Sequence, residues 1–164
     1  MSRPKYFLAT VIMAALLTGT TAAAQAACNL PEASEAMQAE ALKSVNAERA
    51  QAGLRPLKFS STLDKAAQGH ACDNAKRHEI SHVSSDGSKL QHRLKRVGYR
   101  YRSAAENTGR GFRSGSSAVQ WWMNSPKHKS NILMRGVKEV GLGIALSDAP
   151  DNKLHWILVM GEGK

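Results

Sequence analysis

Apolar residues near the start of the chain recur at helical spacing. Between residues 30 and 52, Met37, Ala41 and Val45 lie four positions apart. Positions four apart lie on one side of an α-helix, so this spacing predicts an amphipathic helix with one buried stripe. Gly53 follows directly and is expected to end the helix, because glycine is favoured just past a helix C-terminus.

A second helix is predicted to begin at Ser61. Ser61 and Asp64 resemble a capping box, in which two side chains satisfy free backbone N–H groups of the first turn. One face of this helix collects apolar and small residues together with one histidine: Leu63, Ala66, Ala67, His70 and Asn74. We interpret His70 as a buried scaffold residue, because a lone histidine on such a face is more often core than ligand.

The segment after this helix is rich in turn formers. Residues 79–89 include His82 and the Asp86-Gly87 pair, a common turn sequence, and are predicted to form a loop. Apolar residues then recur at helical spacing and predict a short helix up to Gly98; they are Leu90, Leu94 and Val97.

A strand is predicted over residues 99–106, where two tyrosines favour extended structure. Glu106 would stand at the end of this strand, because Asn107 and Gly109 are turn formers. Residues 109–115 are rich in glycine and serine and are expected to form a mobile loop.

Two further helices are predicted before the end of the chain. Val119, Trp122 and Met123 share one helical face, with Trp121 beside it. Ser125-Pro126 predicts the start of the next helix, because serine can accept a free backbone N–H and proline is tolerated at the first helical position.

The pattern at the C-terminal end indicates the fold class. Residues 138–146 and 154–160 alternate or run apolar around turn formers at 148–152, which predicts an antiparallel hairpin. Helices and strands are interspersed without regular βαβ units. This arrangement predicts an α/β layered domain with an antiparallel sheet.

The N-terminus resembles a secretory signal peptide. Residues 1–26 carry two basic residues, then an uncharged run, then Ala24-Gln25-Ala26, which fits a small-residue cleavage site. We therefore predict an exported protein, secreted or periplasmic, whose mature chain begins near Ala27. A lipoprotein acylated at Cys28 is less favoured, because glutamine stands where such signals have leucine or a similar residue.

The expected mature chain is basic and retains both cysteines. Two of the 23 basic residues leave with residues 1–26, so 21 basic against 13 acidic residues give a formal charge of +8. This charge attracts anionic polymers or membrane surfaces at long range. Cys28 and Cys72 are predicted to form a disulfide, since export exposes them to an oxidising compartment. The bond would tie an N-terminal segment, residues 27–40, to the second helix.

His82, Glu106 and His128 are expected to share one pocket. Two imidazoles and a carboxylate suit zinc with an open position for water. Their separations of 24 and 22 residues do not dictate a metal geometry, however. The same groups could instead form a hydrogen-bonded cluster, or an acid/base pair oriented by the carboxylate. Spacing alone leaves these alternatives open.

Two other functions find less support. A serine hydrolase would draw its nucleophile, base and acid from Ser84, Ser125, His82, His128 and Glu106, but the chain has no G-x-S-x-G motif. Residues 89–102 are strongly basic, yet no nucleic-acid-binding motif accompanies them, and an exported protein seldom meets nucleic acid. Anionic envelope components or lipid head groups fit better as partners, including peripheral contact with a membrane.

Six short motifs occur in a characteristic order: VNAERAQAGLRPL, SHVSSDGS, AENTGRG, WMNSPKHKSNIL, EVGLGIA and HWILVMG. Together they resemble the CAP superfamily (cysteine-rich secretory protein, antigen 5 and pathogenesis-related 1) in its bacterial SCP-like form. The resemblance covers about residues 41–161 and places a CAP domain at 41–164. It implies an α-β-α sandwich with a central antiparallel sheet, and a surface cavity lined by two histidines and two acids.

On this resemblance His82 and His128 match the two histidines, and Glu106 matches the first acid. Asn124 stands where the second acid is expected, which removes one anionic ligand. We therefore expect no required cofactor, and weak zinc binding by His82, His128 and Glu106 at best. Members of the superfamily are associated with lipid or sterol binding, divalent metals and proteolysis, without a shared enzymatic activity.

These observations predict an exported, monomeric binding domain rather than an enzyme. Its ligand would be a lipid, a sterol-like molecule or another envelope component, held in the cavity formed by His82, Glu106, Asn124 and His128. Two alternatives remain from the sequence: a metal-dependent, protease-like hydrolase that uses the same cavity, and a structural envelope protein that needs no cavity.

Overall fold

The computed structural model describes residues 28–151 and 153–164, so the expected signal peptide over residues 1–26 lies outside the described residues. In chain order the elements are α1 (Ser34–Gln51), β1 (Lys58–Phe59), α2 (Ser61–Arg77), α3 (Leu90–Arg96), β2 (Tyr101–Arg110), α4 (Gly115–Met123), α5 (Pro126–Ile132), β3 (Glu139–Leu146) and β4 (Leu154–Gly163). No helix in the described part of the chain is both long and apolar enough to cross a membrane.

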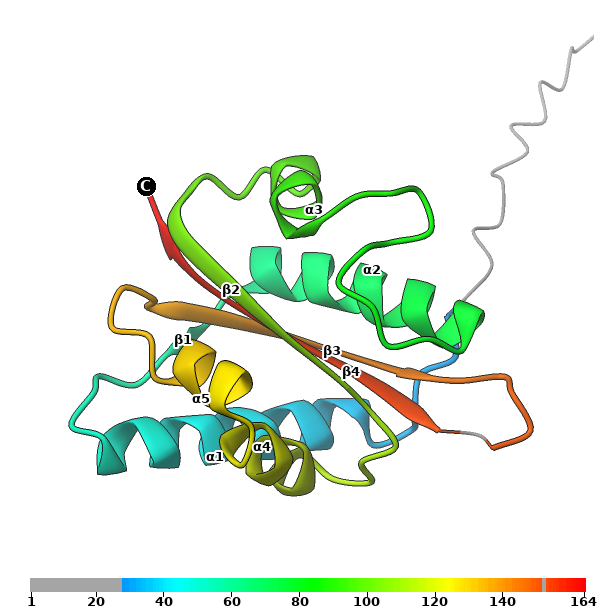
Figure 1. The fold of residues 1–164 in the computed structure, drawn as a ribbon, viewed down its shortest axis with the longest axis horizontal. Coiled ribbons are helices and arrows are strands. Elements are labelled where there is room, and N and C mark those ends of the chain that lie inside the picture. The colour runs from blue at the N-terminus through cyan, green and yellow to red at the C-terminus, as the bar shows by residue number, and fades with distance from the viewer. Residues whose placement is uncertain (1–27, 152) are drawn as a thin grey trace, which may run out of the picture.

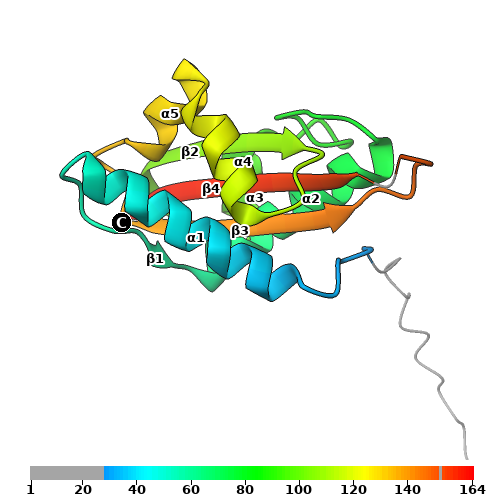
Figure 2. The same ribbon diagram turned by 90° about the horizontal axis from the view of Figure 1, so that it is seen from below.

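The strands form one sheet between two helical layers (Figure 1). Their order is β1-β3-β4-β2. Helices α2 and α3 lie on one face, and α1, α4 and α5 cover the other, as Figure 2 shows from below. The central strand β4 is buried on both faces, because Trp156 and Leu158 belong to the core under α1 and α4, whereas Ile157 and Val159 belong to the core under α2. The predicted α-β-α sandwich is confirmed.

The sequence predicts a wholly antiparallel sheet, but the sheet is mixed. β2, β4 and β3 pair antiparallel, and β3 and β4 form the predicted hairpin. Lys58 and Phe59 of β1, however, pair in parallel with Glu139 and Val140 of β3. A two-residue strand carries no periodic pattern, so β1 could not be predicted from alternation.

Strand β2 is longer than its sequence predicts. It continues to Arg110, with Asn107 paired to Leu158 and Gly109 paired to Trp156 in β4. The prediction that Glu106 ends the strand is therefore wrong, as is the expectation of a mobile loop beginning at Gly109. The turn preference of Asn107 is overridden because its side chain is fully buried against α5, where both ends of its amide find partners.

Helix α2 packs against β3 at unusually close range. A Cβ atom built on Gly141 would lie 2.1 Å from the backbone nitrogen of Asp64, and one on Gly143 would lie 2.3 Å from the carbonyl oxygen of Ala67. Any side chain at these positions would push the helix off the sheet. The glycines of the EVGLGIA motif therefore set the distance between the two layers.

The start of α2 differs from the predicted capping box. Ser60, one residue earlier than expected, caps the helix by accepting a hydrogen bond from the backbone N–H of Leu63. Asp64 instead uses its carboxylate to accept the backbone N–H of Leu142 at 3.2 Å. This side chain joins the helix to the sheet, because β3 passes close enough to compete with the helix's own N–H groups.

The N-terminal segment is connected to α2 and to β3. Cys28 and Cys72 form the predicted disulfide, with their Cα atoms 5.5 Å apart. The carbonyl oxygen of Asn29 accepts a hydrogen bond from Leu146 N–H at 2.7 Å. Helix α1 begins at Ser34 and therefore runs across the expected boundary between residues 27–40 and 41–164.

Candidate functional site

Glu106 lies in the middle of β2, and only 6% of the residue is exposed. Its Oε2 accepts a hydrogen bond from the guanidinium of Arg93 at 2.6 Å, and its Oε1 accepts one from Nδ1 of His82 at 2.9 Å. A buried carboxylate requires such partners, because its charge has lost the stabilisation that water provides. The structure thus brings His82 and Glu106 into direct contact and adds a third residue that the sequence did not single out.

That residue, Arg93 on α3, also holds the preceding loop in place. Its Nη1 donates to the carbonyl oxygens of His82 at 3.1 Å and Ser88 at 2.9 Å. The sequence suggested that Arg93 belongs to a basic surface, but only 5% of it is exposed. Its position three residues after Leu90 and four before Val97, on the apolar face of the helix, is the signal that could have identified it.

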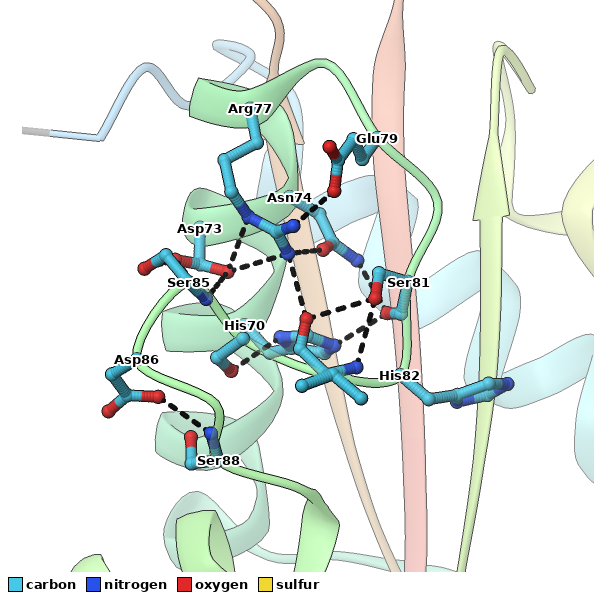
Figure 3. Close-up of polar contacts among 12 residues, drawn as sticks. His70, Asp73, Asn74, Arg77, Glu79, Ser81, His82, Ser85, Asp86 and Ser88 are labelled. Atoms are coloured by element: carbon cyan, nitrogen blue, oxygen red, sulfur yellow. Dashed lines mark hydrogen bonds and ion pairs between the residues drawn. The ribbon is translucent and has the colours of Figure 1, made fainter.

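His70 on α2 fixes the same loop from the other side. Its Nε2 donates to the carbonyl oxygen of Ser81 at 2.8 Å, so Nδ1 is free to accept a hydrogen bond from the hydroxyl of Ser84 at 3.0 Å. Figure 3 shows His70 and Asn74 both directed at Ser81. Burial lowers the pKa of His70, which favours this neutral form. The residue is buried scaffold, as interpreted from the sequence.

The loop carries His82 toward strand β2 (Figure 3). The side chain of His82 is 59% exposed, although its Nδ1 contacts the buried carboxylate of Glu106. Because Nδ1 is engaged, Nε2 is the ring nitrogen left for a ligand. The arrangement presents one orientation-fixed imidazole at the surface.

Helix α5 brings His128 to the same strand. The side-chain amide of Asn107 donates to the carbonyl oxygen of His128 at 3.0 Å. Asn131, one turn further along α5, donates to the Asn107 side chain at 2.8 Å and to the Glu106 carbonyl oxygen at 3.2 Å. These two asparagines position His128, and sequence reasoning assigned neither of them that role.

The imidazole of His128 is hydrogen bonded through Nδ1 to the hydroxyl of Ser125 at 2.8 Å. Pro126 occupies the first helical position as predicted, but Ser125 binds this ring rather than capping the backbone. Burial lowers the pKa of His128, and positive charge on the nearby His82 lowers it further. His128 is therefore neutral at pH 7 and contributes a ring rather than a charge.

Three aromatic rings, one of them that of His128, form a partly exposed surface. It is here called the aromatic surface and consists of Phe112, Trp121 and His128. The ring centroid of Trp121 lies 5.4 Å from that of Phe112 and 5.2 Å from that of His128. Trp121 is 46% exposed, whereas its neighbour Trp122 is fully buried and donates its indole N–H to the Thr108 carbonyl oxygen. Only one of the adjacent tryptophans is therefore a core residue.

Asn124 takes no part in these contacts. It is the C-cap of α4 and is exposed to solvent. Within residues 28–151 and 153–164, no hydrogen bond joins its side chain to His82, Glu106 or His128. His82 and His128 are thus each hydrogen bonded to a residue of β2, the first through its ring and the second through its carbonyl oxygen.

The donor set does not fit a metal ion. No three His, Cys, Asp or Glu side chains of the described residues are grouped so that they could hold one. Both oxygens of Glu106 already accept hydrogen bonds, one of them from Arg93. A cation bound there would displace Arg93 and leave its buried charge without an anion. In the described residues His82, His128 and Glu106 do not form a group of three metal ligands, and zinc binding by them stays a prediction.

The chain is similar in sequence to bacterial proteins of one family. Residues 42–160 match the model of the CAP, or Cysteine-rich secretory protein, family. The chain is 31% identical to YkwD of Bacillus subtilis over 113 residues, which are 69% of this chain and 44% of that protein. It spans 29% of a second Bacillus subtilis relative, YlbC, at 29% identity. This chain therefore corresponds to less than half the length of either relative.

Solved structures show the same fold. An outer surface protein from Borrelia burgdorferi superimposes with a TM-score of 0.74 at 20% identity and covers 84% of this chain and 100% of its own. An extracellular SCP-domain protein from Bacillus anthracis gives a TM-score of 0.68 at 24% identity, over 78% of this chain and 41% of its own. With a family model that spans most of its length and a fold shared with solved SCP domains, the chain belongs to the cysteine-rich secretory protein, or CAP, family.

Proposed function

We propose that this CAP domain is exported and binds an amphipathic anion, such as a fatty acid or another lipid, on the aromatic surface beside His82. The exposure of Trp121 carries the proposal. A tryptophan that is 46% exposed and lies between two other rings has a large apolar area in contact with water. Apolar surface next to oriented polar groups is typical of ligand sites.

The two parts of this site suit the two parts of such a ligand. The rings of the aromatic surface would contact an acyl chain, and the protonated imidazole of His82, with its Nδ1–H donated to Glu106, would donate its Nε2–H to the head group. Arg93 balances the charge of Glu106, so the support beneath His82 carries no net negative charge that would repel an anion. The basic composition of the chain favours the same sign of ligand.

Export is supported by two independent features. The first 26 residues have the charge and small-residue pattern of a secretory signal. The neighbours of known structure include an outer surface protein and an extracellular protein.

A metal-dependent hydrolase at the same place receives less support, because Arg93 occupies one oxygen of the carboxylate that would have to bind the metal. Calorimetric titration with zinc at about pH 7.5, above the ordinary histidine pKa, separates the two functions. Tight zinc binding that is lost in both His82→Ala and His128→Ala would favour the hydrolase and contradict our assignment.

The binding proposal is tested directly with dodecanoate as a soluble probe. Trp122 and Trp156 are fully buried, so a change in tryptophan emission on binding would report on Trp121. We expect dodecanoate to shift the emission of the wild-type protein to shorter wavelength. Calorimetry should show about tenfold weaker binding for His82→Gln, the loss expected for one hydrogen bond to a charged head group.

Trp121→Ala should also lose most of the affinity, whereas Phe59→Ala, which removes another exposed aromatic side chain at the opposite edge of the sheet, should not. Dodecanol serves as the uncharged comparison and should bind wild type and His82→Gln alike. Unchanged dodecanoate affinity in Trp121→Ala would remove the aromatic surface from consideration.

A further inference from the structure

A cavity lies away from the candidate site, at one end of the sheet. It has a volume of about 800 Å³, within the range of small-molecule sites. Its walls come from the loop after α1, the loop before β3 and the end of β4, which lie on the left of Figure 2 around the C label. Six basic residues line it: Arg49, Arg55, Lys58, Arg135, Lys138 and Lys164.

The acidic residues of this cavity are already engaged. Glu139 accepts the hydroxyl of Tyr99 at 2.6 Å, and Glu162 pairs with Lys138 at 2.6 Å. Within the described part of the chain, by contrast, Arg55, Lys58 and Arg135 form no ion pair within 4.0 Å. Six basic against two acidic lining residues leave a formal charge of +4. The exposed side chains of Arg55, Lys58 and Arg135 are therefore open to a ligand rather than cancelled by a carboxylate within the protein.

Arg49 makes the walls of the cavity rigid. It is 2% exposed, and its guanidinium donates to the carbonyl oxygens of Arg55 at 2.9 Å, Ile132 at 2.7 Å and Met134 at 3.0 Å. Carbonyl dipoles are thus its hydrogen-bond partners, and burial lowers its pKa. The loop after α1 and the loop before β3 are held by one side chain, so the cations they carry are preorganised.

We propose that this cavity binds an organic phosphate with at least two phosphate groups. At pH 7 each phosphate carries about −1.5 to −2 charges as a monoester and about −1 as a diester, so two of them offset half or more of the formal positive charge. Arg55 and Arg135 can each bind phosphate oxygens in a fork, and Lys58 adds a point charge. The carbon skeleton would lie against the apolar lining residues Leu54, Pro56 and Val137.

Two sources could supply this chemistry: a free sugar bisphosphate, or a lipid head group with two phosphates. Calorimetric titration with a hexose bisphosphate and with pyrophosphate measures the free form. Co-sedimentation with cardiolipin vesicles, compared with phosphatidylcholine vesicles, measures the lipid form. Binding of the soluble probes but not cardiolipin assigns a free ligand, and the reverse assigns a lipid; both outcomes support the phosphate site.

The matched variants remove the same charge from two places. Lys58→Gln with Arg135→Gln removes two positive charges from the lining of the cavity. Lys43→Gln with Arg113→Gln removes one lysine and one arginine that do not line it. We expect the first pair to weaken binding at least tenfold and to flatten its salt dependence, and the second pair to change it less than threefold. Arg49 is left intact because its loss would disturb folding.

The proposal is overturned if none of the probes binds, or if the two pairs of substitutions weaken binding equally, because net charge alone would then explain the result. Site-resolved NMR adds a check that does not depend on affinity. The backbone amides of Gly53 and Gly163, which line the cavity, should shift on titration with pyrophosphate, whereas that of Gly69 on α2 should not. Dodecanoate binding at Trp121 is unaffected by either result, since no residue is shared between the two sites.

Discussion

At the scale of single residues, the ion pair of Arg93 and Glu106 anchors the candidate site. It is buried, and it connects α3, strand β2 and the loop that carries His82. An exposed imidazole alone would sample many orientations. Contact with a carboxylate that is itself held by a buried guanidinium limits His82 to one.

Replacing Glu106 with Gln should therefore destabilise the whole domain. The guanidinium of Arg93 would remain buried without an anion, which costs about 3 kcal/mol of the free energy of unfolding. Chemical denaturation measures this value. Glu79→Gln, which removes the carboxylate of a surface pair with Arg77, is the control and should change stability by less than about 0.5 kcal/mol. Equal effects of the two substitutions would mean that the buried pair is not an anchor.

A second residue-scale prediction concerns pH. His155 is 1% exposed, and burial together with the neighbouring Arg110 lowers its pKa to about 4. The unfolded chain takes up this proton near pH 6.5 but the folded protein does not. The corresponding stability is therefore fully present above pH 6.5 and is lost as pH falls toward 4.

Between pH 7.5 and 5 this one group should cost about 2 kcal/mol of the free energy of unfolding. The lowered pKa values of His70 and His128 act in the same direction. The measurement compares denaturation of wild type and His155→Gln at the two pH values. The variant should lose less stability than wild type on acidification, whatever its starting stability, and an identical loss would contradict the assignment.

At the scale of elements, the contact between α2 and β3 determines how closely the layers approach. Gly143→Ala would place a methyl group 2.3 Å from the backbone of Ala67, so helix or strand must move. We expect a loss of about 1–3 kcal/mol, as for other overpacked interiors. Gly69→Ala is the matched control, because nothing lies within 4 Å of its Cβ position on α2. That change should stabilise the protein by about 0.5–1 kcal/mol, which thermal unfolding can verify.

The length of each element largely decides whether it could be predicted from the sequence. The helices α1 and α2 and the hairpin of β3 and β4 are long enough to show a clear period. The predicted end of β2 is wrong because Asn107 prefers turns when considered alone. The partners in α5 that hold it in the strand lie more than twenty residues away in the sequence. Local propensity does not include such long-range partners.

Some residues of the candidate site could be predicted from the sequence and others could not. His82, Glu106 and His128 could be identified from their chemistry and motif context. Counting charge along residues 89–102 predicts that Arg93 belongs to a basic surface, whereas its position on the apolar face of α3 buries it. The mixed sheet also depends on a long-range pairing, that of Lys58 with Glu139, which no local pattern reports.

At the scale of the whole molecule, the two proposed binding regions lie on different parts of one sandwich. The candidate site uses β2, α3, α4 and α5, whereas the basic cavity uses the ends of α1 and β4 and the loop before β3. No described residue belongs to both regions. Ligands at the two places should therefore bind independently, and saturation with pyrophosphate should leave the affinity for dodecanoate unchanged in calorimetry.

The disulfide acts on the whole chain, because it connects the segment before α1 to the middle of α2. Cys28 and Cys72 are separated by 44 residues, and closing a loop of that length lowers the entropy of the unfolded chain and so raises its free energy by about 4 kcal/mol at 25 °C. Cys28→Ser with Cys72→Ser should lose a large part of this value in denaturation experiments. Because α1 and the sheet retain their own contacts, the variant should stay folded, with circular dichroism unchanged at low temperature. Alkylation of the native wild-type protein without reductant, followed by intact mass measurement, supplies the complementary test, and two modified thiols would show that the bond is absent in the isolated protein.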